Sequence, residues 1–183
     1  MATDAPPSTG ALAFRPATMA DLTDLHRLVE HAYRGEEARK GWSHEADLLG
    51  GQRTDVEALT EVIVDSSRVV LLAHRNDVLT GCVMLARQDD GSAYLGMLSV
   101  EPGLQAGGLG RRLLEVAETE ARTRFAADRV EMTVIRQRPE LIAWYERRGY
   151  ALTGATADFP MDDERFGQPK RRDLQFVVLS KTL

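Results

Sequence analysis

A glycine-rich segment in the middle of the chain has the residue types to bind an anion through its backbone. It consists of Gln105, Ala106, Gly107, Gly108, Leu109, Gly110, Arg111 and Arg112. Glycine has no Cβ, so backbone N–H groups at such positions can approach a phosphate closely. The helix expected after the segment adds the positive end of its dipole, and the two arginines add full charges. The segment therefore predicts a pyrophosphate site, with a plain strand-to-helix turn as the alternative.

The spacing of these glycines differs from that of two common nucleotide-binding loops. No Gly-Lys-Ser/Thr triplet follows the segment, which excludes a Walker loop, and Leu113 stands where the dinucleotide fingerprint has its third glycine. A second segment, residues 141–150, has the pattern of an amphipathic helix that Gly149 ends. Taken alone, this pattern would place Tyr145 in the core.

The two segments together resemble the GNAT superfamily of N-acetyltransferases, which use acetyl-CoA. Gln105-x-x-Gly108-x-Gly110 is similar to the acetyl-CoA signature of that superfamily, and residues 144–150 are similar to its later LYExxGF-type segment. The resemblance extends over residues 69–152, with weaker agreement outside. At Arg138 the chain departs from the pattern, because many members have there an asparagine that contacts the cofactor.

The resemblance implies acetyl-CoA as the co-substrate, with no metal. The cofactor would lie between two strands that splay apart, against the backbone of Leu98, Ser99 and Val100, and residues 105–112 would hold its pyrophosphate. The resemblance also implies transfer of the acetyl group to a primary amine by direct attack, with Tyr145 protonating the departing CoA thiolate.

The acceptor side is less defined by the sequence. Residues 94–99, where some members have a glutamate, contain no carboxylate. We expect Glu45 to act as the catalytic carboxylate and to attract a cationic amine, and Trp42 and His44 to contact this acceptor, a small molecule or a peptide amine. The alternatives are acidic residues of a late loop, Asp162, Asp163 and Glu164. Each of these acids could instead be a helix-capping or solvated residue.

Two other functions fit the same residues. A CoA-binding module with little catalysis would use the same glycine-rich segment for regulation or assembly, and the missing strand carboxylate favours it. An unrelated phosphate-binding protein would require both matching segments to be coincidental. Tyr145 favours the enzyme.

Composition bounds these hypotheses. The 183 residues suggest one domain, and 23 Lys and Arg against 28 Asp and Glu give a net charge of −5, which argues against a nucleic-acid partner. The longest apolar runs have five residues, so no membrane span is expected.

The lone Cys82 excludes an internal disulfide and fits the cytoplasm, and the histidines form no zinc motif. We expect a disordered leader over residues 1–10, a single domain over residues 11–183, and a possible homodimer.

The pattern of elements predicts an α/β (α+β) fold with a mixed, mostly antiparallel sheet and flanking helices. Its splayed central parallel strands, which the resemblance implies, would be residues 93–100 and 129–135. Other strands are expected near residues 12–14 and over residues 69–73, 78–86, 150–153 and 174–179, with a turn at Asn76-Asp77. Helices are expected over residues 19–33, 43–49, 54–64, 109–121 and 139–149. Residues 156–170 read as a polar loop.

Overall fold

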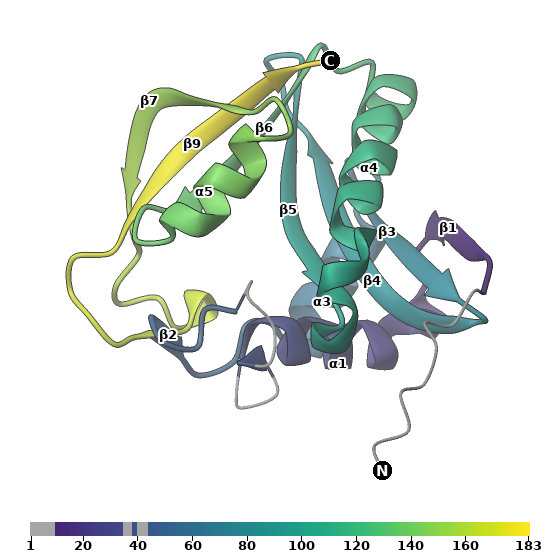
Figure 1. Ribbon diagram of the computed structural model, residues 1–183, viewed down its shortest axis with the longest axis horizontal. Helices are drawn as coiled ribbons and strands as arrows, with labels where there is room; N and C mark the ends of the chain where they lie inside the picture. Colours follow the sequence, from purple (N-terminus) through teal and green to yellow (C-terminus); the bar gives the residue numbers. More distant parts are fainter. Residues whose placement is uncertain (1–9, 35–37, 40–43) are drawn as a thin grey trace.

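The computed structural model describes residues 10–34, 38–39 and 44–183 (Figure 1). Apart from Gly10, the expected leader lies outside the described residues, and so does Trp42. In the part of the chain that the structure describes, no helix is long and apolar enough to cross a membrane.

A seven-stranded sheet contains both the first and the last long strand. Its strands follow the order β1-β3-β4-β5-β6-β9-β7, and every neighbouring pair is antiparallel except β5 with β6. These strands are β1 (Leu12–Pro16), β3 (Arg68–Arg75), β4 (Val78–Arg87), β5 (Ser92–Val100), β6 (Arg129–Ile135), β9 (Gln175–Thr182) and β7 (Ala151–Asp158). Two short strands, β2 (Leu49–Gly50) and β8 (Gln168–Pro169), pair separately. The predicted mixed, mostly antiparallel sheet is confirmed.

Helices cover both faces of this sheet. They are α1 (Leu22–Tyr33), α3 (Val56–Val64), α4 (Leu109–Phe125) and α5 (Pro139–Glu146), with 3-10 turns at Met19–Asp21, Pro102–Gly107 and Glu164–Phe166. The side chains of β3 alternate between the faces: Leu71 packs with α4, whereas Leu72 packs with α1 and α3. Each buried leucine of this kind contributes roughly 1.5–3 kcal/mol.

The hairpin between β3 and β4 forms where the sequence predicts it. Asn76 and Asp77 both have positive φ values, 49° and 62°. Two consecutive residues of this conformation make a type I′ turn, which Asn and Asp tolerate and which matches the twist of the strands. The turn aligns β3 with β4 and so places β4 beside β5.

The central parallel strands separate soon after they begin. Ser92, Ala93 and Tyr94 of β5 pair with β6, and the ladder between the two strands ends there (Figure 1). Further along β5, its register with β4 shifts and Met97 has a φ of 55°, which is the geometry of a β-bulge. The Tyr94 hydroxyl and the Thr133 hydroxyl are 2.9 Å apart across the base of the gap.

Three expectations about local structure are wrong. Residues 46–48 form a single turn, in which the N–H groups of Leu48 and Leu49 donate to the carbonyl of Glu45, and the chain then enters β2 instead of forming a helix over residues 43–49. The helix expected over residues 54–64 begins two residues later, at Val56, because Asp55 is its N-cap and the Asp55 side chain accepts a hydrogen bond from the Ala58 N–H.

The third concerns the expected loop over residues 156–170. β7 continues to Asp158, since residues 156–158 pair with β9, and β8 near the end of the region pairs with β2. Both differences arise from pairing with segments distant in the sequence, which a local pattern does not reveal.

Candidate active site

A groove lies beside the end of β5, between the start of α4 and helix α5. It encloses about 250 Å³ and is lined by Tyr33, Leu98, Val100, Gln105, Gly108, Gly110, Arg111, Leu141, Trp144, Tyr145 and Arg148. Six of these residues were predicted to bind the cofactor, and Tyr145 was predicted to be catalytic. The groove therefore collects residues from both segments that the sequence analysis singled out.

The glycine-rich segment leaves open space above its backbone. Gly108 caps α4 with a φ of 75°, and a Cβ built on Gly107 or Gly108 would have no atom within 4 Å. A positive φ favours glycine, which explains the residue at this turn. A Cβ on Gly110 would lie 3.5 Å from the Trp144 ring, so this glycine also keeps the groove wide.

Arg148, which the sequence analysis did not single out, lines the same groove from beyond the end of α5. Its guanidinium lies 3.6 Å from the centroid of the Trp144 ring, and its Nη1 donates to the Trp144 carbonyl at 2.6 Å. Its Nε is buried and has no hydrogen-bond partner. Burial and then the charges of Arg147 and Arg111 lower the pKa of Arg148. The Arg148 Nε–H is thus a buried donor in the wall of the groove, from which a phosphate oxygen could accept a hydrogen bond.

Four other residues expected at the cofactor, Ser99, Gly107, Leu109 and Arg112, do not line the groove. Leu109 is buried in the core beneath α4, and the buried Ser99 hydroxyl donates to the carbonyl of Met97. Gln105 does line the groove, and its amide donates to the carbonyl of Val100 and so ties the segment to β5. Arg112 is exposed, and neither it nor Gly107 is among the residues lining the groove.

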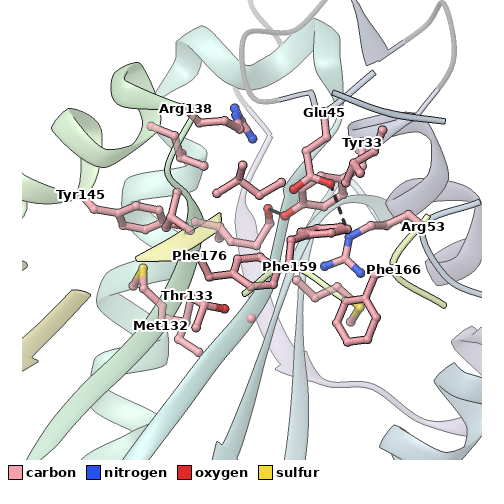
Figure 2. Close-up of a pocket in the computed structure, with 18 of the residues that line it drawn as sticks. Tyr33, Glu45, Arg53, Met132, Thr133, Arg138, Tyr145, Phe159, Phe166 and Phe176 are labelled. Carbon is pink, nitrogen blue, oxygen red and sulfur yellow. Dashed lines mark hydrogen bonds and ion pairs between the residues drawn. The ribbon is translucent and has the colours of Figure 1, made fainter. Parts of the chain in front are cut away.

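A second cavity lies on the other side of the gap between β5 and β6. It encloses about 130 Å³, and Figure 2 shows its polar residues converging from several elements. Its wall contains Tyr33, Glu45, Leu49, Arg53, Tyr94, Leu95, Gly96, Met97, Leu98, Met132, Thr133, Val134, Ile135, Arg138, Leu141, Tyr145, Phe159, Phe166 and Phe176. This cavity combines ionisable groups with an aromatic surface.

The groove and the cavity share Tyr33, Leu98, Leu141 and Tyr145. Tyr145 is 6% exposed, and its ring packs edge-on against Trp144 with centroids 5.0 Å apart. Burial, reinforced by neighbouring Tyr33, raises the pKa of Tyr145 well above its usual range. Its phenol is therefore protonated at neutral pH and lies where molecules in the two spaces would meet.

Tyr33 fixes the backbone of this shared wall. Its hydroxyl donates to the carbonyl of Leu98 at 2.6 Å, and Arg53 lies over its ring, 5.1 Å from the centroid. Burial is the main cause that raises the pKa of Tyr33 to about 12, so this phenol keeps its proton. The hydrogen bond connects α1 to the bulged part of β5.

Glu45 lies in the cavity wall as one member of an ion-pair cluster. Its Oε2 is 2.8 Å from Arg34 Nη1 and 3.9 Å from Arg53 Nε. Burial alone would raise the pKa of Glu45, but the charges of Arg53 and Arg34 outweigh this effect and lower it. Glu45 is therefore ionised at neutral pH, and two arginines compensate its charge.

Comparison with known proteins shows the family to which the chain belongs. A model of the acetyltransferase (GNAT) family matches residues 23–150. The chain belongs to this family. The matched residues include all those that line the groove, together with α5, which carries Tyr145.

Solved structures of GNAT acetyltransferases have the same fold. The ribosomal-protein-alanine N-acetyltransferase of Brucella melitensis is 21% identical with a TM-score of 0.69, over 93% of this chain and 99% of that one. The PaiA N-acetyltransferase of Thermoplasma acidophilum, in complex with coenzyme A, is 19% identical with a TM-score of 0.67, over 94% and 99%. A variant of the spermidine N-acetyltransferase of Vibrio cholerae is 16% identical with a TM-score of 0.68, over 93% of each chain.

Of the other residues expected at the acceptor, those that the structure describes do not line the cavity. His44 is not in the wall of either space, and its Nδ1 is buried without a hydrogen-bond partner. Asp163 caps the 3-10 turn beside β8 and pairs with Arg165, and neither it nor its acidic neighbours line the cavity. Trp42 lies outside the described residues. Cys82 is buried, and burial raises the pKa of its thiol to about 12.

The sequence analysis missed most of the residues that line the second cavity. Arg53 precedes α3, Arg138 precedes α5, and the three phenylalanines come from the last 25 residues of the chain. Arg138 did have a signal, since it departs from the family pattern. The others have none that is local, because the fold alone brings these segments together.

Proposed function

We propose that this GNAT enzyme transfers an acetyl group from acetyl-CoA to a primary amine by direct attack. The observation that carries the proposal is that Tyr145 lies in the wall common to a groove with a glycine-rich cationic end and a separate aromatic cavity. A protonated phenol between two binding spaces is placed to serve a reaction between their occupants.

The residues of the groove fit acetyl-CoA. The open space above Gly107 and Gly108, the start of α4 and the guanidinium groups of Arg111 and Arg148 suit a pyrophosphate. The backbone of Leu98 and Val100 borders the groove where β5 no longer pairs with β6. When bound, acetyl-CoA supplies an acetyl group activated as a thioester.

Tyr145 moves the proton that the leaving group needs. The bond that forms joins the amine nitrogen to the carbonyl carbon of the acetyl group, and the bond that breaks joins this carbon to sulfur. Tyr145 donates its phenolic proton to the sulfur and recovers a proton from the acylated nitrogen. The raised pKa of Tyr145 ensures that the proton is present beforehand.

The cavity on the other side receives the acceptor. An alkylammonium has a pKa of about 10.4 and must lose one proton before it can attack. Glu45 attracts the ammonium by its charge, whereas its lowered pKa makes it a weak base, so this first proton passes to water.

Release of CoA thiol from acetyl-CoA in the presence of a panel of amines tests the proposal. The panel contains amino acids, a peptide with a free N-terminal alanine, and spermidine. We expect at least one amine to give thiol release that Tyr145→Phe reduces. Binding of acetyl-CoA with no release from any amine would instead support the CoA-binding module.

A further inference from the structure

Aromatic side chains are concentrated in the wall of the second cavity. The chain has five phenylalanines and four tyrosines, all of them within the described residues. They are spread along the sequence, yet six of the nine line this one cavity: Tyr33, Tyr94, Tyr145, Phe159, Phe166 and Phe176. Each of the six comes from a different part of the fold, so tertiary structure gathers them here. A wall of this kind favours a ligand that packs against rings.

The three phenylalanines form a continuous apolar part of this wall (Figure 2). The ring of Phe159 packs against Phe166 with centroids 6.4 Å apart and against Phe176 with centroids 5.2 Å apart. Phe166 nevertheless remains 40% exposed, and Met132 and Ile135 of β6 border the same space. A dry apolar cavity of about 150 Å³ is large enough for benzene. The 130 Å³ of this cavity therefore suits a single ring.

The hydroxyl groups of the wall have hydrogen-bond partners inside the protein. The Tyr33 hydroxyl donates to the Leu98 carbonyl, and the hydroxyls of Tyr94 and Thr133 lie within hydrogen-bond distance of each other. Arg53 lies over the Tyr33 ring and so occupies a face that could otherwise bind a cationic ligand. These residues therefore offer a ligand mainly ring surface, which prefers another aromatic ring placed edge-on or with an offset.

We infer that the acceptor is a primary amine that carries one aromatic ring. The ring packs against Phe159, Phe166 and Phe176, and the amine faces the wall that contains Tyr145. The alternative is that the aromatic wall surrounds the ammonium group itself, in which case the rest of the acceptor need not be aromatic. The inference rests on the proposed acetyl transfer for its reaction, but its binding test does not depend on turnover.

Three amines of equal charge test the role of the ring. Phenethylamine carries it, 2-cyclohexylethylamine replaces it by a saturated ring of similar size, and propylamine replaces it by a methyl group. The protein saturated with CoA is titrated with each amine in a calorimeter. We expect phenethylamine to bind roughly 10- to 100-fold more tightly than propylamine and roughly 2- to 10-fold more tightly than 2-cyclohexylethylamine. Equal or tighter binding of either analogue would overturn the inference.

Variants of Phe166 locate the ring, and the fold should tolerate them because this side chain is partly exposed. Phe166→Ala should lower phenethylamine affinity roughly 5- to 10-fold and leave propylamine affinity within about twofold. Phe166→Leu keeps an apolar side chain and should lose less. The matched control is Phe125→Ala at the end of α4, which lines neither space and should leave both affinities unchanged. Parent-like binding of phenethylamine to Phe166→Ala would contradict the assignment.

Thiol release measured with the same amines separates this inference from the proposed function. If phenethylamine binds preferentially but no amine gives release, the acetyl transfer is wrong and the ligand assignment stands. If propylamine, spermidine or the peptide with a free N-terminal alanine gives release at least as efficiently as phenethylamine, the ligand assignment is wrong and the acetyl transfer stands.

Discussion

The hydroxyl of Tyr33 donates a hydrogen bond to the carbonyl oxygen of Leu98 at 2.6 Å. This contact joins α1 to β5 just after the bulge at Met97, and both residues line the groove and the cavity. The backbone that borders the groove proposed for the cofactor is therefore held by a side chain that also borders the cavity proposed for the acceptor. A substitution of Tyr33 should therefore affect both the groove and the cavity.

Tyr33→Phe removes this hydrogen bond and keeps the ring. We expect the free energy of unfolding to fall by about 1 kcal/mol and acetyl-CoA affinity to fall by a few-fold, because the β5 backbone is less firmly held. Calorimetry and denaturant unfolding measure the two effects. Tyr94→Phe is the control, since Tyr94 lines the cavity but not the groove and its hydroxyl contacts Thr133. It should lose similar stability and bind acetyl-CoA normally; equal loss of affinity in both variants would contradict the role of Tyr33.

Tyr145→Phe removes the proposed proton donor. We expect kcat to fall by roughly 10²–10⁴, with little change in acetyl-CoA affinity, because the ring and its packing remain. The matched control is Tyr150→Phe: this phenol is also buried and donates to Glu118, but it lines neither space. Steady-state kinetics with an active amine measure the difference. A parent-like kcat in Tyr145→Phe would assign the proton transfer to another group.

Gly110→Ala narrows the cofactor groove without straining the backbone. The new Cβ would lie 3.5 Å from Trp144 and 3.8 Å from Val100, both ordinary contacts between two groove residues. We expect acetyl-CoA affinity to fall about tenfold, with stability unchanged or raised by up to about 1 kcal/mol. Gly108 is less suitable for this test, since its φ of 75° strains any side chain.

Gly103→Ala is the control for this prediction. A Cβ on Gly103 would meet no atom within 4 Å, and Gly103 does not line the groove. Titration of both variants with acetyl-CoA should show a loss in Gly110→Ala alone. If the two bind equally, the groove is not the cofactor site.

Those features of the site that depend on neighbouring residues could be predicted from the sequence. The turn at Asn76-Asp77, the start of α4 after the glycines and the helix that carries Tyr145 each have a local pattern, and the structure has them where the sequence places them. The helix expected over residues 43–49 failed because β2 pairs with β8, more than a hundred residues later.

The cavity proposed for the acceptor could not be predicted from the sequence for the same reason. Many of its charged and aromatic residues come from the segment before α3, the segment before α5 and the end of the chain, so only the folded arrangement shows that they lie together. The partners of Glu45 could not be predicted either. Arg34 and Arg53 lie 11 and 8 residues away in the sequence, too far for a pair between adjacent turns of one helix, so only the fold shows that they meet Glu45.

The pairing of Glu45 with Arg34 and Arg53 predicts a pH-dependent contribution to stability. Because the folded state lowers the pKa of Glu45, its contribution is fully present above the ordinary value near 4.5 and is lost as the pH falls through the folded-state pKa. Glu45→Gln removes this contribution and leaves the buried Arg34 without its charged partner. We expect the variant to be less stable by roughly 3 kcal/mol at pH 7.

Denaturant unfolding from pH 7 to pH 3 tests this prediction. The difference in unfolding free energy between the parent and Glu45→Gln should be constant down to about pH 5 and should shrink as the pH falls further, because acid neutralises Glu45 in the parent. The control is Asp47→Asn, since Asp47 is 67% exposed and pairs with Arg39 at the surface. It should cost less than about 1 kcal/mol. A Glu45→Gln difference that does not change with pH would show that packing, and not charge, makes Glu45 important, and would also remove the reason to expect it to attract an ammonium group.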